Sequence, residues 1–131
     1  MRTIETTITK RVLTPFSERA PEGCGAAVEF LGIVRGEENG EPIEALEYEA
    51  YQPMAELQMQ RVIRELLLEY PCEVVRVSHR IGVVPVGEAA IAVQVASRHR
   101  GAAFSFLACF MDRLKQEVPI WKIKALPAPV L

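Results

Sequence analysis

Apolar and polar positions alternate in several stretches of the chain, and short uninterrupted apolar runs mark others. Both patterns are typical of strands. They predict strands over residues 4–13, 26–35, 43–51, 73–81, 89–96 and 120–126. Gly32 interrupts one apolar run and predicts a bulge or a close backbone approach there. We expect 43–51 to pair back on 26–35 as a hairpin with a register irregularity.

Two segments have a pattern typical of helices. Pro53 suits the first position of a helix, and apolar residues then recur every three or four positions as far as Tyr70. This spacing predicts an amphipathic helix of about five turns that stops before Pro71. Residues 102–114 are apolar nearly all round, which predicts a second, buried helix.

The element order β-β-β-α-β-β-α-β predicts an α+β fold. We expect a two-layer arrangement, with two main helices on one face of a mainly antiparallel sheet. Residues 82–88 are expected to be a turn, and the proline-rich tail 127–129 is not expected to continue the last strand. No repeat, low-complexity segment or linker divides residues 1–131, so we expect a single domain. The aromatic side chains expected in the core are Phe104, Phe106, Phe110 and Trp121.

Composition excludes several classes of protein. The chain has 131 residues, of which 50% are hydrophobic and 24% charged, so it is too apolar for a disordered protein. No stretch approaches the roughly 20 apolar residues of a membrane helix, and the first residues lack a signal peptide's apolar core. We expect a cytoplasmic protein. Cys24, Cys72 and Cys109 have no metal-ligand spacing, so we expect free thiols and no metal site.

The net charge of −2 conceals an uneven distribution. Residues 1–75 contain 7 Lys or Arg and 14 Asp or Glu, whereas residues 76–131 contain 8 Lys or Arg and 3 Asp or Glu. A basic segment in an acidic protein favours a local anion site over a nucleic-acid-binding surface. The acidic stretch 37–42 is interpreted as a solvated loop.

The segment Ser97-Arg98-His99-Arg100-Gly101 joins a predicted strand to the second predicted helix. Unpaired N–H groups and the positive dipole end of a helix attract anions, and Arg and His side chains add charged donors. A solvated basic turn explains the same residues equally well. The residues alone leave both interpretations open.

Lys115 and Lys122 flank the turn expected at Pro119. Because the chain reverses there, the two side chains could meet in one cleft. Neighbouring ammonium groups lower each other's pKa, which can make a lysine nucleophilic or basic. The plainer interpretation is favoured on the residues alone: lysines are common at helix C-termini and on edge strands. Arg35 suits a phosphate anchor or an ordinary strand end, and His79 is interpreted as structural or peripheral.

Five blocks of residues then appear in order and with a characteristic spacing: 30–35, 49–55, 79–82, 97–104, and 111–115 with 118–122. Together they resemble the large, catalytic subunit of molybdopterin synthase. The resemblance covers roughly residues 25–124. No single block is decisive, but five in order are a specific signal.

The resemblance implies an α/β hammerhead fold and a homodimer, which forms a heterotetramer with a small ubiquitin-like sulfur carrier. The carrier's C-terminal Gly-Gly thiocarboxylate enters the active site and delivers two sulfurs to cyclic pyranopterin monophosphate, giving the dithiolene of molybdopterin. By position, Lys115 and Lys122 match the family's essential lysines, and Arg35, His99 and Arg100 match its substrate-anion contacts. No cofactor is implied, because the sulfur arrives on the partner.

Lys124 departs from the family pattern, which usually has an acidic residue two places after the second lysine. We expect Lys124 to join the substrate-binding residues. The departure keeps a second function open, a non-catalytic module of the same fold that binds an anion or the carrier. Carrier binding without product would identify that module. Nucleic-acid binding is disfavoured, because the net charge is negative and no recognised module is present.

Overall fold

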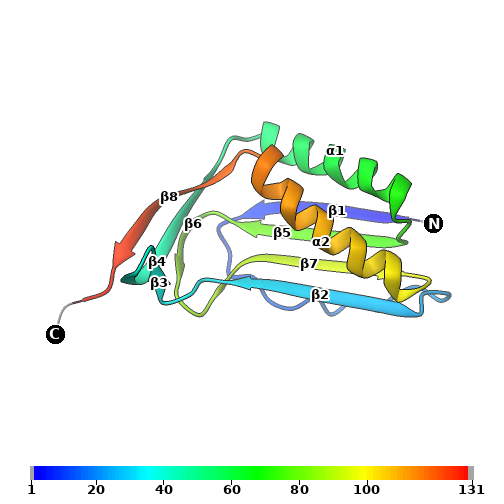
Figure 1. The fold of residues 1–131 in the computed structure, drawn as a ribbon, viewed down its shortest axis with the longest axis horizontal. Helices are drawn as coiled ribbons and strands as arrows, with labels where there is room; N and C mark the ends of the chain where they lie inside the picture. Colours follow the sequence, from blue (N-terminus) through cyan, green and yellow to red (C-terminus); the bar gives the residue numbers. More distant parts are fainter. Residues whose placement is uncertain (1, 130–131) are drawn as a thin grey trace.

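The structure, a computed structural model, describes residues 2–129 and contains two β-sheets with two helices over one of them (Figure 1). The first sheet has the order β1 (Thr3–Thr9), β5 (Val74–Arg80), β7 (Ala89–Ser97) and β2 (Ala26–Ile33). β1 and β5 are parallel, whereas the other neighbours are antiparallel. α1 (Met54–Glu69) and α2 (Arg100–Glu117) cover one face.

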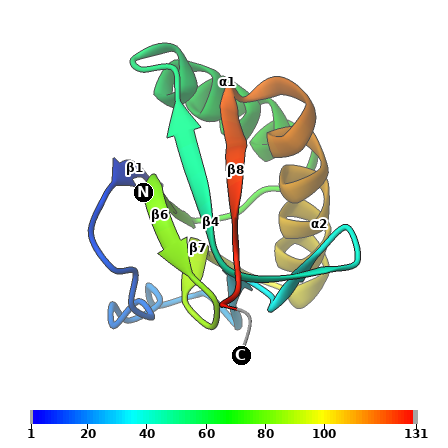
Figure 2. The same ribbon diagram turned by 90° about the vertical axis from the view of Figure 1, so that its left-hand side faces the viewer.

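The second sheet is built around β4 (Glu41–Ala50), which pairs with β6 (Gly82–Pro85) on one side and β8 (Ile120–Pro127) on the other. Figure 2 shows these three strands side by side. The short β3 (Glu37–Glu38) forms a hairpin with the start of β4. Gly82 has a φ of +83°, and this left-handed residue turns the chain from β5 in one sheet directly into β6 in the other.

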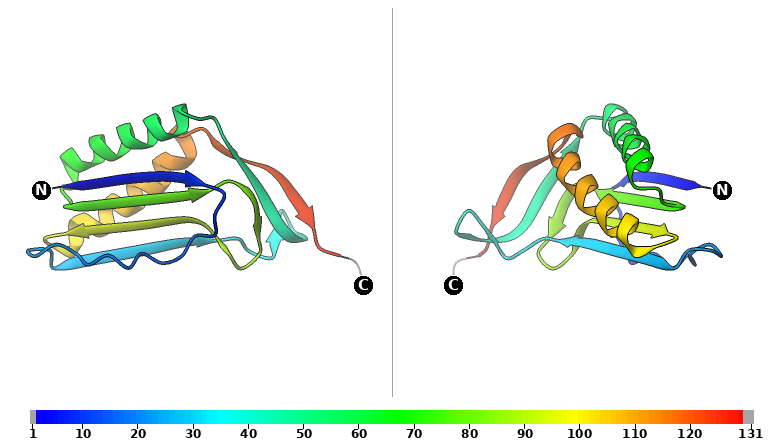
Figure 3. Two further views of the ribbon diagram at one scale, coloured as in Figure 1. Left: turned by 180° about the vertical axis from the view of Figure 1, so that it is seen from behind. Right: turned by 45° about the vertical axis from the view of Figure 1, so that its right-hand side comes forward.

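The segment between β1 and β2 crosses the face of the first sheet that the helices leave open (Figure 3). Gln94 Nε2 on β7 donates a hydrogen bond to the carbonyl oxygen of Glu18 in this segment (3.4 Å). Near its end, the backbone N–H of Gly25 donates to the carbonyl oxygen of Arg98 (3.1 Å). No helix within residues 2–129 is long and apolar enough to cross a membrane.

The predicted α+β class, with two helices and mainly antiparallel strands, is confirmed. The predicted hairpin is wrong: β4 does not pair with β2 but belongs to the second sheet. The expected turn at 82–88 contains β6, and β8 continues to Pro127, whose partner in register is Ile43. The irregularity predicted at Gly32 is present, between Gly32 and Ile33 in β2. The one predicted for the hairpin has no counterpart there, but the register of β4 shifts at two places against β8.

α1 forms as its sequence predicts. Pro53 precedes its first residue, and Pro71 follows Tyr70, the residue that caps its C-terminus. Its apolar stripe is buried against the first sheet and α2; the buried residues are Ala55, Met59, Val62, Ile63, Leu66 and Leu67. Burial of this stripe, more than helix propensity, stabilises a helix of this length.

α2 buries one face and leaves the other open to solvent, so the prediction of a helix buried all round is wrong. Phe106 and Phe110 are fully buried and stacked, with ring centroids 6.1 Å apart. Phe104 on the outer face is 56% exposed and Trp121 on β8 is 51% exposed, so these two aromatic residues are not in the core as expected.

An ion cluster joins the outer faces of the two helices near the C-terminal end of α2. Arg61 and Glu65 on α1 alternate with Arg113 and Glu117 on α2, at N–O distances of 2.5 to 2.9 Å. The Arg113 guanidinium, assisted by Arg61, lowers the pKa of Glu117 to about 2. The cluster fixes the helix end that carries Lys115.

Candidate functional site

A cavity of about 470 Å³ lies where the two sheets and the C-terminal end of α2 meet. Arg35, Lys115 and Lys122 all line it. Arg35 follows β2, Lys115 is in the last turn of α2, and Lys122 is on β8, so three separate elements supply the three cations. All three residues are exposed, so the cavity has a cationic mouth.

A β-bulge in β8 aims Lys122 into the cavity and Lys124 away from it. Residues two apart on a regular strand share a face. Here Lys122 pairs with Tyr48 and Lys124 with Glu47, because the register shifts between these two β4 residues. Adjacent β4 residues face opposite sides of the sheet, and so do their partners. Tyr48 lines the cavity with Lys122, whereas Lys124 does not line it.

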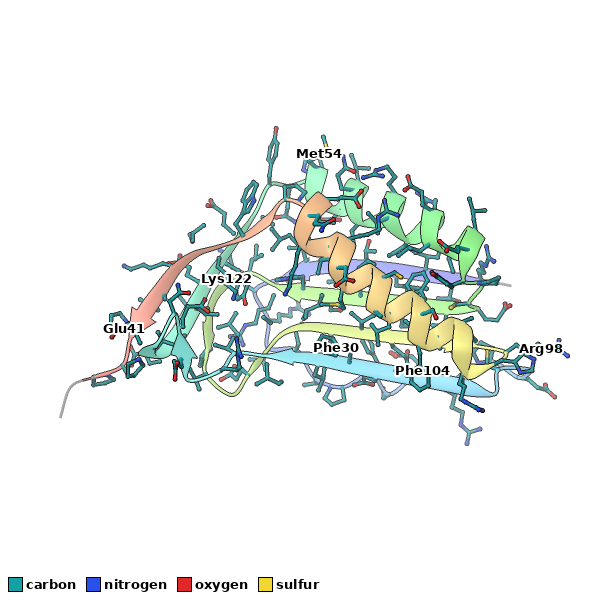
Figure 4. The ribbon with its side chains drawn as sticks, in the orientation of Figure 1. Phe30, Glu41, Met54, Arg98, Phe104 and Lys122 are labelled. Atoms are coloured by element: carbon teal, nitrogen blue, oxygen red, sulfur yellow. The ribbon has the colours of Figure 1, made fainter. Side chains whose placement is uncertain are left out.

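His99 and Arg100 also lie outside this cavity, at the N-terminal end of α2. Lys115 follows Arg100 by 15 positions, which corresponds to about 22 Å along a helix. Figure 4 shows Lys122 and Arg98, the neighbour of His99, at opposite ends of α2. One copy of the chain therefore brings together three of the six predicted site residues.

The deeper wall of the cavity contains a neutral polar pair that the sequence analysis did not assign to the site. His79, at 6% exposure, and the half-buried Tyr48 both line the cavity. Their rings meet edge to face, with centroids 5.4 Å apart and an angle of 67° between their planes. Burial lowers the pKa of His79. It also raises the pKa of Tyr48, with a smaller contribution from Glu38.

Glu38 is the acidic partner in the site. Its carboxylate Oε2 lies 3.3 Å from Lys122 Nζ. The acidic stretch 37–42 was expected to be a solvated loop, but the β3–β4 hairpin places Glu38 on the cavity wall. Glu38 thus forms an ion pair with Lys122 when no other anion is bound. Within residues 2–129, neither Lys115 nor Arg35 has an ion-pair partner.

Apart from Glu37, which lies beside Glu38 in the hairpin, the remaining wall is apolar, with Phe30 and Met111 among its members. Phe30 is labelled on β2 in Figure 4. Gly32 also lines the cavity, at the bulge in β2, and a Cβ atom there would come within 2.7 Å of Ile91 Cγ2, so a larger residue would force the Ile91 side chain to shift. Three cations, two neutral polar rings and an apolar wall can hold a ligand that combines an anionic group with a flat ring.

A metal centre has no support in the described part of the chain. Residues 2–129 contain no group of three or more His, Cys, Asp or Glu side chains that could hold a metal ion. Cys24, Cys72 and Cys109 are free thiols, as expected. Burial raises the pKa of Cys72 to about 11, so its thiol stays protonated at neutral pH.

Comparison with known proteins identifies the family. The family described as MoaE protein matches residues 5–117. A human protein named molybdopterin synthase catalytic subunit is 41% identical over 99 residues, 76% of this chain and 53% of that protein. The chain thus spans about half the length of the mammalian relatives that it matches.

Solved structures agree with this assignment. The crystal structure of molybdopterin synthase from Staphylococcus aureus is 33% identical, with a TM-score of 0.84 over 99% of this chain and 95% of that one. A complex of subunits 1 and 2 of molybdopterin-converting factor from Helicobacter pylori includes a chain with the same fold. That chain is 18% identical, with a TM-score of 0.67 over 95% of this chain and 89% of that one. The chain described here belongs to the MoaE protein family.

Proposed function

We propose that this protein is the catalytic subunit of a molybdopterin synthase. It converts cyclic pyranopterin monophosphate to molybdopterin, with sulfur from the C-terminal thiocarboxylate of a small ubiquitin-like carrier. The observation that carries the proposal is the convergence of Arg35, Lys115 and Lys122 on one cavity. The relatives' names support the same activity. As the sequence analysis expects, the proposal places the reaction in the cytoplasm.

The charges of the site suit both reactants. The substrate carries a cyclic phosphate and the carrier ends in a thiocarboxylate, so two anions must be brought together. Three cations at the mouth of the cavity reduce their mutual repulsion and position the sulfur near the substrate. An arriving anion displaces the Glu38 carboxylate from Lys122, because the two compete for the same ammonium group.

In each transfer the carrier's sulfur forms a bond to a side-chain carbon of the pterin as an oxygen substituent leaves that carbon, either an oxygen of the phosphate ring or a water molecule. Hydrolysis of the resulting thioester then breaks the bond between the carrier's carbonyl carbon and the sulfur, and returns the carrier as a carboxylate. As charge builds up on the opening phosphate ring, Lys115 and Lys122 stabilise it electrostatically and can deliver a proton. The sulfur comes from the partner, so the proposal requires no cofactor.

The test is a reconstitution. We expect the protein, a thiocarboxylated carrier and cyclic pyranopterin monophosphate to give a product whose mass spectrum shows two added sulfur atoms. The matched control is the same carrier with an ordinary C-terminal carboxylate, which should give no product. Carrier binding without product in the complete mixture would contradict the proposal and support the non-catalytic module.

His99 and Arg100 enter the proposal through a second copy of the chain. Because they lie about 22 Å from Lys115 along α2, they cannot serve the cavity of their own copy. We propose a homodimer within a heterotetramer, in which these residues reach the partner copy's cavity. Isologous contact in a two-fold dimer would give two equivalent shared sites.

A complementation experiment tests this shared site. Lys115→Ala and Arg100→Ala should each abolish turnover as homodimers. In hybrids made by co-expression, one of the two sites carries both changes and the other carries neither. Random pairing should therefore restore about a quarter of the native activity. A mixture as inactive as its components would contradict the shared site, but it would leave the roles proposed for Lys115 and Lys122 unchanged.

A further inference from the structure

His79 is a buried titratable residue in the cavity that the proposed mechanism does not use. Its side chain lies at the deep wall, whereas Arg35, Lys115 and Lys122 are exposed at the mouth. The edge-to-face contact with Tyr48 holds its ring in place. The cavity thus has a cationic outer part and an uncharged inner part.

The hydrogen bonds of His79 define which ring nitrogen is available. Nδ1 lies 2.8 Å from the carbonyl oxygen of Arg80. A carbonyl oxygen can only accept a hydrogen bond, so Nδ1 carries the proton. Burial lowers the pKa of His79, which keeps the ring neutral near pH 7. Nε2 is therefore an unprotonated acceptor.

Nε2 is not fully enclosed by the protein. Within residues 2–129, the one fully enclosed side-chain nitrogen or oxygen without a partner is Arg80 Nε. His79 Nε2 makes no hydrogen bond within the same residues, yet it is not enclosed. Since His79 lines the cavity and its Nδ1 is engaged by the Arg80 carbonyl oxygen, Nε2 is the ring nitrogen left to contact a ligand there.

We propose that His79 is a substrate-binding residue whose Nε2 accepts a hydrogen bond from an N–H group of the substrate's uncharged ring system. This inference rests on the proposed function and deepens it. A reduced pterin carries ring and amino N–H groups that suit such an acceptor, whereas the lone pair repels a phosphate. His79 therefore orients the ligand, with its ring at the deep wall and its phosphate at the mouth near Lys122.

The test compares two ligands, inorganic phosphate and cyclic pyranopterin monophosphate, by calorimetry. His79→Leu should weaken binding of the pterin by about tenfold, the effect of one lost hydrogen bond in a desolvated site. It should leave phosphate affinity unchanged. His79→Gln, whose amide oxygen can accept near the position of Nε2, should recover most of the loss. Lys122→Ala should instead weaken the binding of both ligands.

Ser78→Ala is the matched control, because residue 78 precedes His79 on β5 and faces the other side of the sheet. It should change neither affinity. Unchanged pterin binding by His79→Leu would overturn the inference and leave the proposed function standing. Equal losses for both ligands would also overturn it, because they would indicate a purely structural role. Failure of the unaltered protein to bind the pterin would instead count against the proposed function.

A measurement on the unaltered protein is independent of whether His79→Leu folds. The ¹⁵N resonance of His79 Nε2 should move upfield when the pterin is added, as an acceptor nitrogen does on hydrogen bonding. It should stay in place with inorganic phosphate. If the chemical shift of Nε2 does not change when the pterin is added at a concentration where calorimetry shows binding, the inference is overturned.

Discussion

Replacement of Lys122 by alanine should lower the turnover number by about 10²- to 10⁴-fold, the range observed when a positioned proton-transfer group is lost. The fold should survive, because the side chain is half exposed and its one ion pair, with Glu38, lies at the surface. The thermal midpoint should therefore stay close to that of the unaltered protein. Single-turnover kinetics with saturating carrier and substrate would measure the loss.

Lys124→Ala is the matched control for this experiment. It removes the same side chain from the same strand two residues later, but on the opposite face of the sheet. Turnover should change by less than about twofold, as is usual for a surface substitution away from the site. Equal losses for the two lysines would contradict the orientation that the bulge gives to β8.

Loss of Lys122 also leaves the Glu38 carboxylate at the mouth of the cavity without its cation. The double variant Lys122→Ala, Glu38→Gln separates the two effects. If Lys122 acts in the chemical step, the double variant should remain inactive. Recovery of turnover would show instead that the single change acted through repulsion between Glu38 and the anionic reactants.

The sequence was sufficient to predict the helices and most strands, because their signals are local. Pro53 and Pro71 bracket α1, and Gly32 marks the bulge in β2, where a Cβ atom would crowd Ile91. The sheet to which β4 belongs could not be predicted in this way. Alternation in β4 shows that one of its faces is buried but not which strands lie beside it.

The same distinction applies to the site. The turn at Pro119, which brings β8 back beside the end of α2, allowed Lys115 and Lys122 to meet, although the residues alone favoured the plainer interpretation. Arg35 was expected beside them only through the family resemblance. Lys124 could not be placed, because the register shift that turns it away leaves no residue-type signal in β8. His79 was interpreted as structural or peripheral for a related reason: a histidine in a buried strand becomes informative only when the cavity beside it is known.

Phe110→Ala should destabilise the protein by about 3–5 kcal/mol, the usual cost of removing a fully buried phenylalanine. Phe110 has no exposed surface and stacks on Phe106 within the core that joins α2 to α1 and the first sheet. Because a domain of this size has roughly 5–15 kcal/mol of stability in total, the variant should be close to the limit of folding. Urea titration should show a lower midpoint with an unchanged slope.

Phe104→Ala provides the comparison, since it removes the same side chain from the same helix on the solvent-exposed face. At 56% exposure, Phe104 loses little apolar contact on truncation, and its cost should stay below about 1 kcal/mol. Equal midpoints for the two variants would contradict the orientation of α2. Lys115 lies five residues after Phe110, and the same orientation of α2 directs it to the cavity. Equal midpoints would therefore also remove the structural basis for the proposed site.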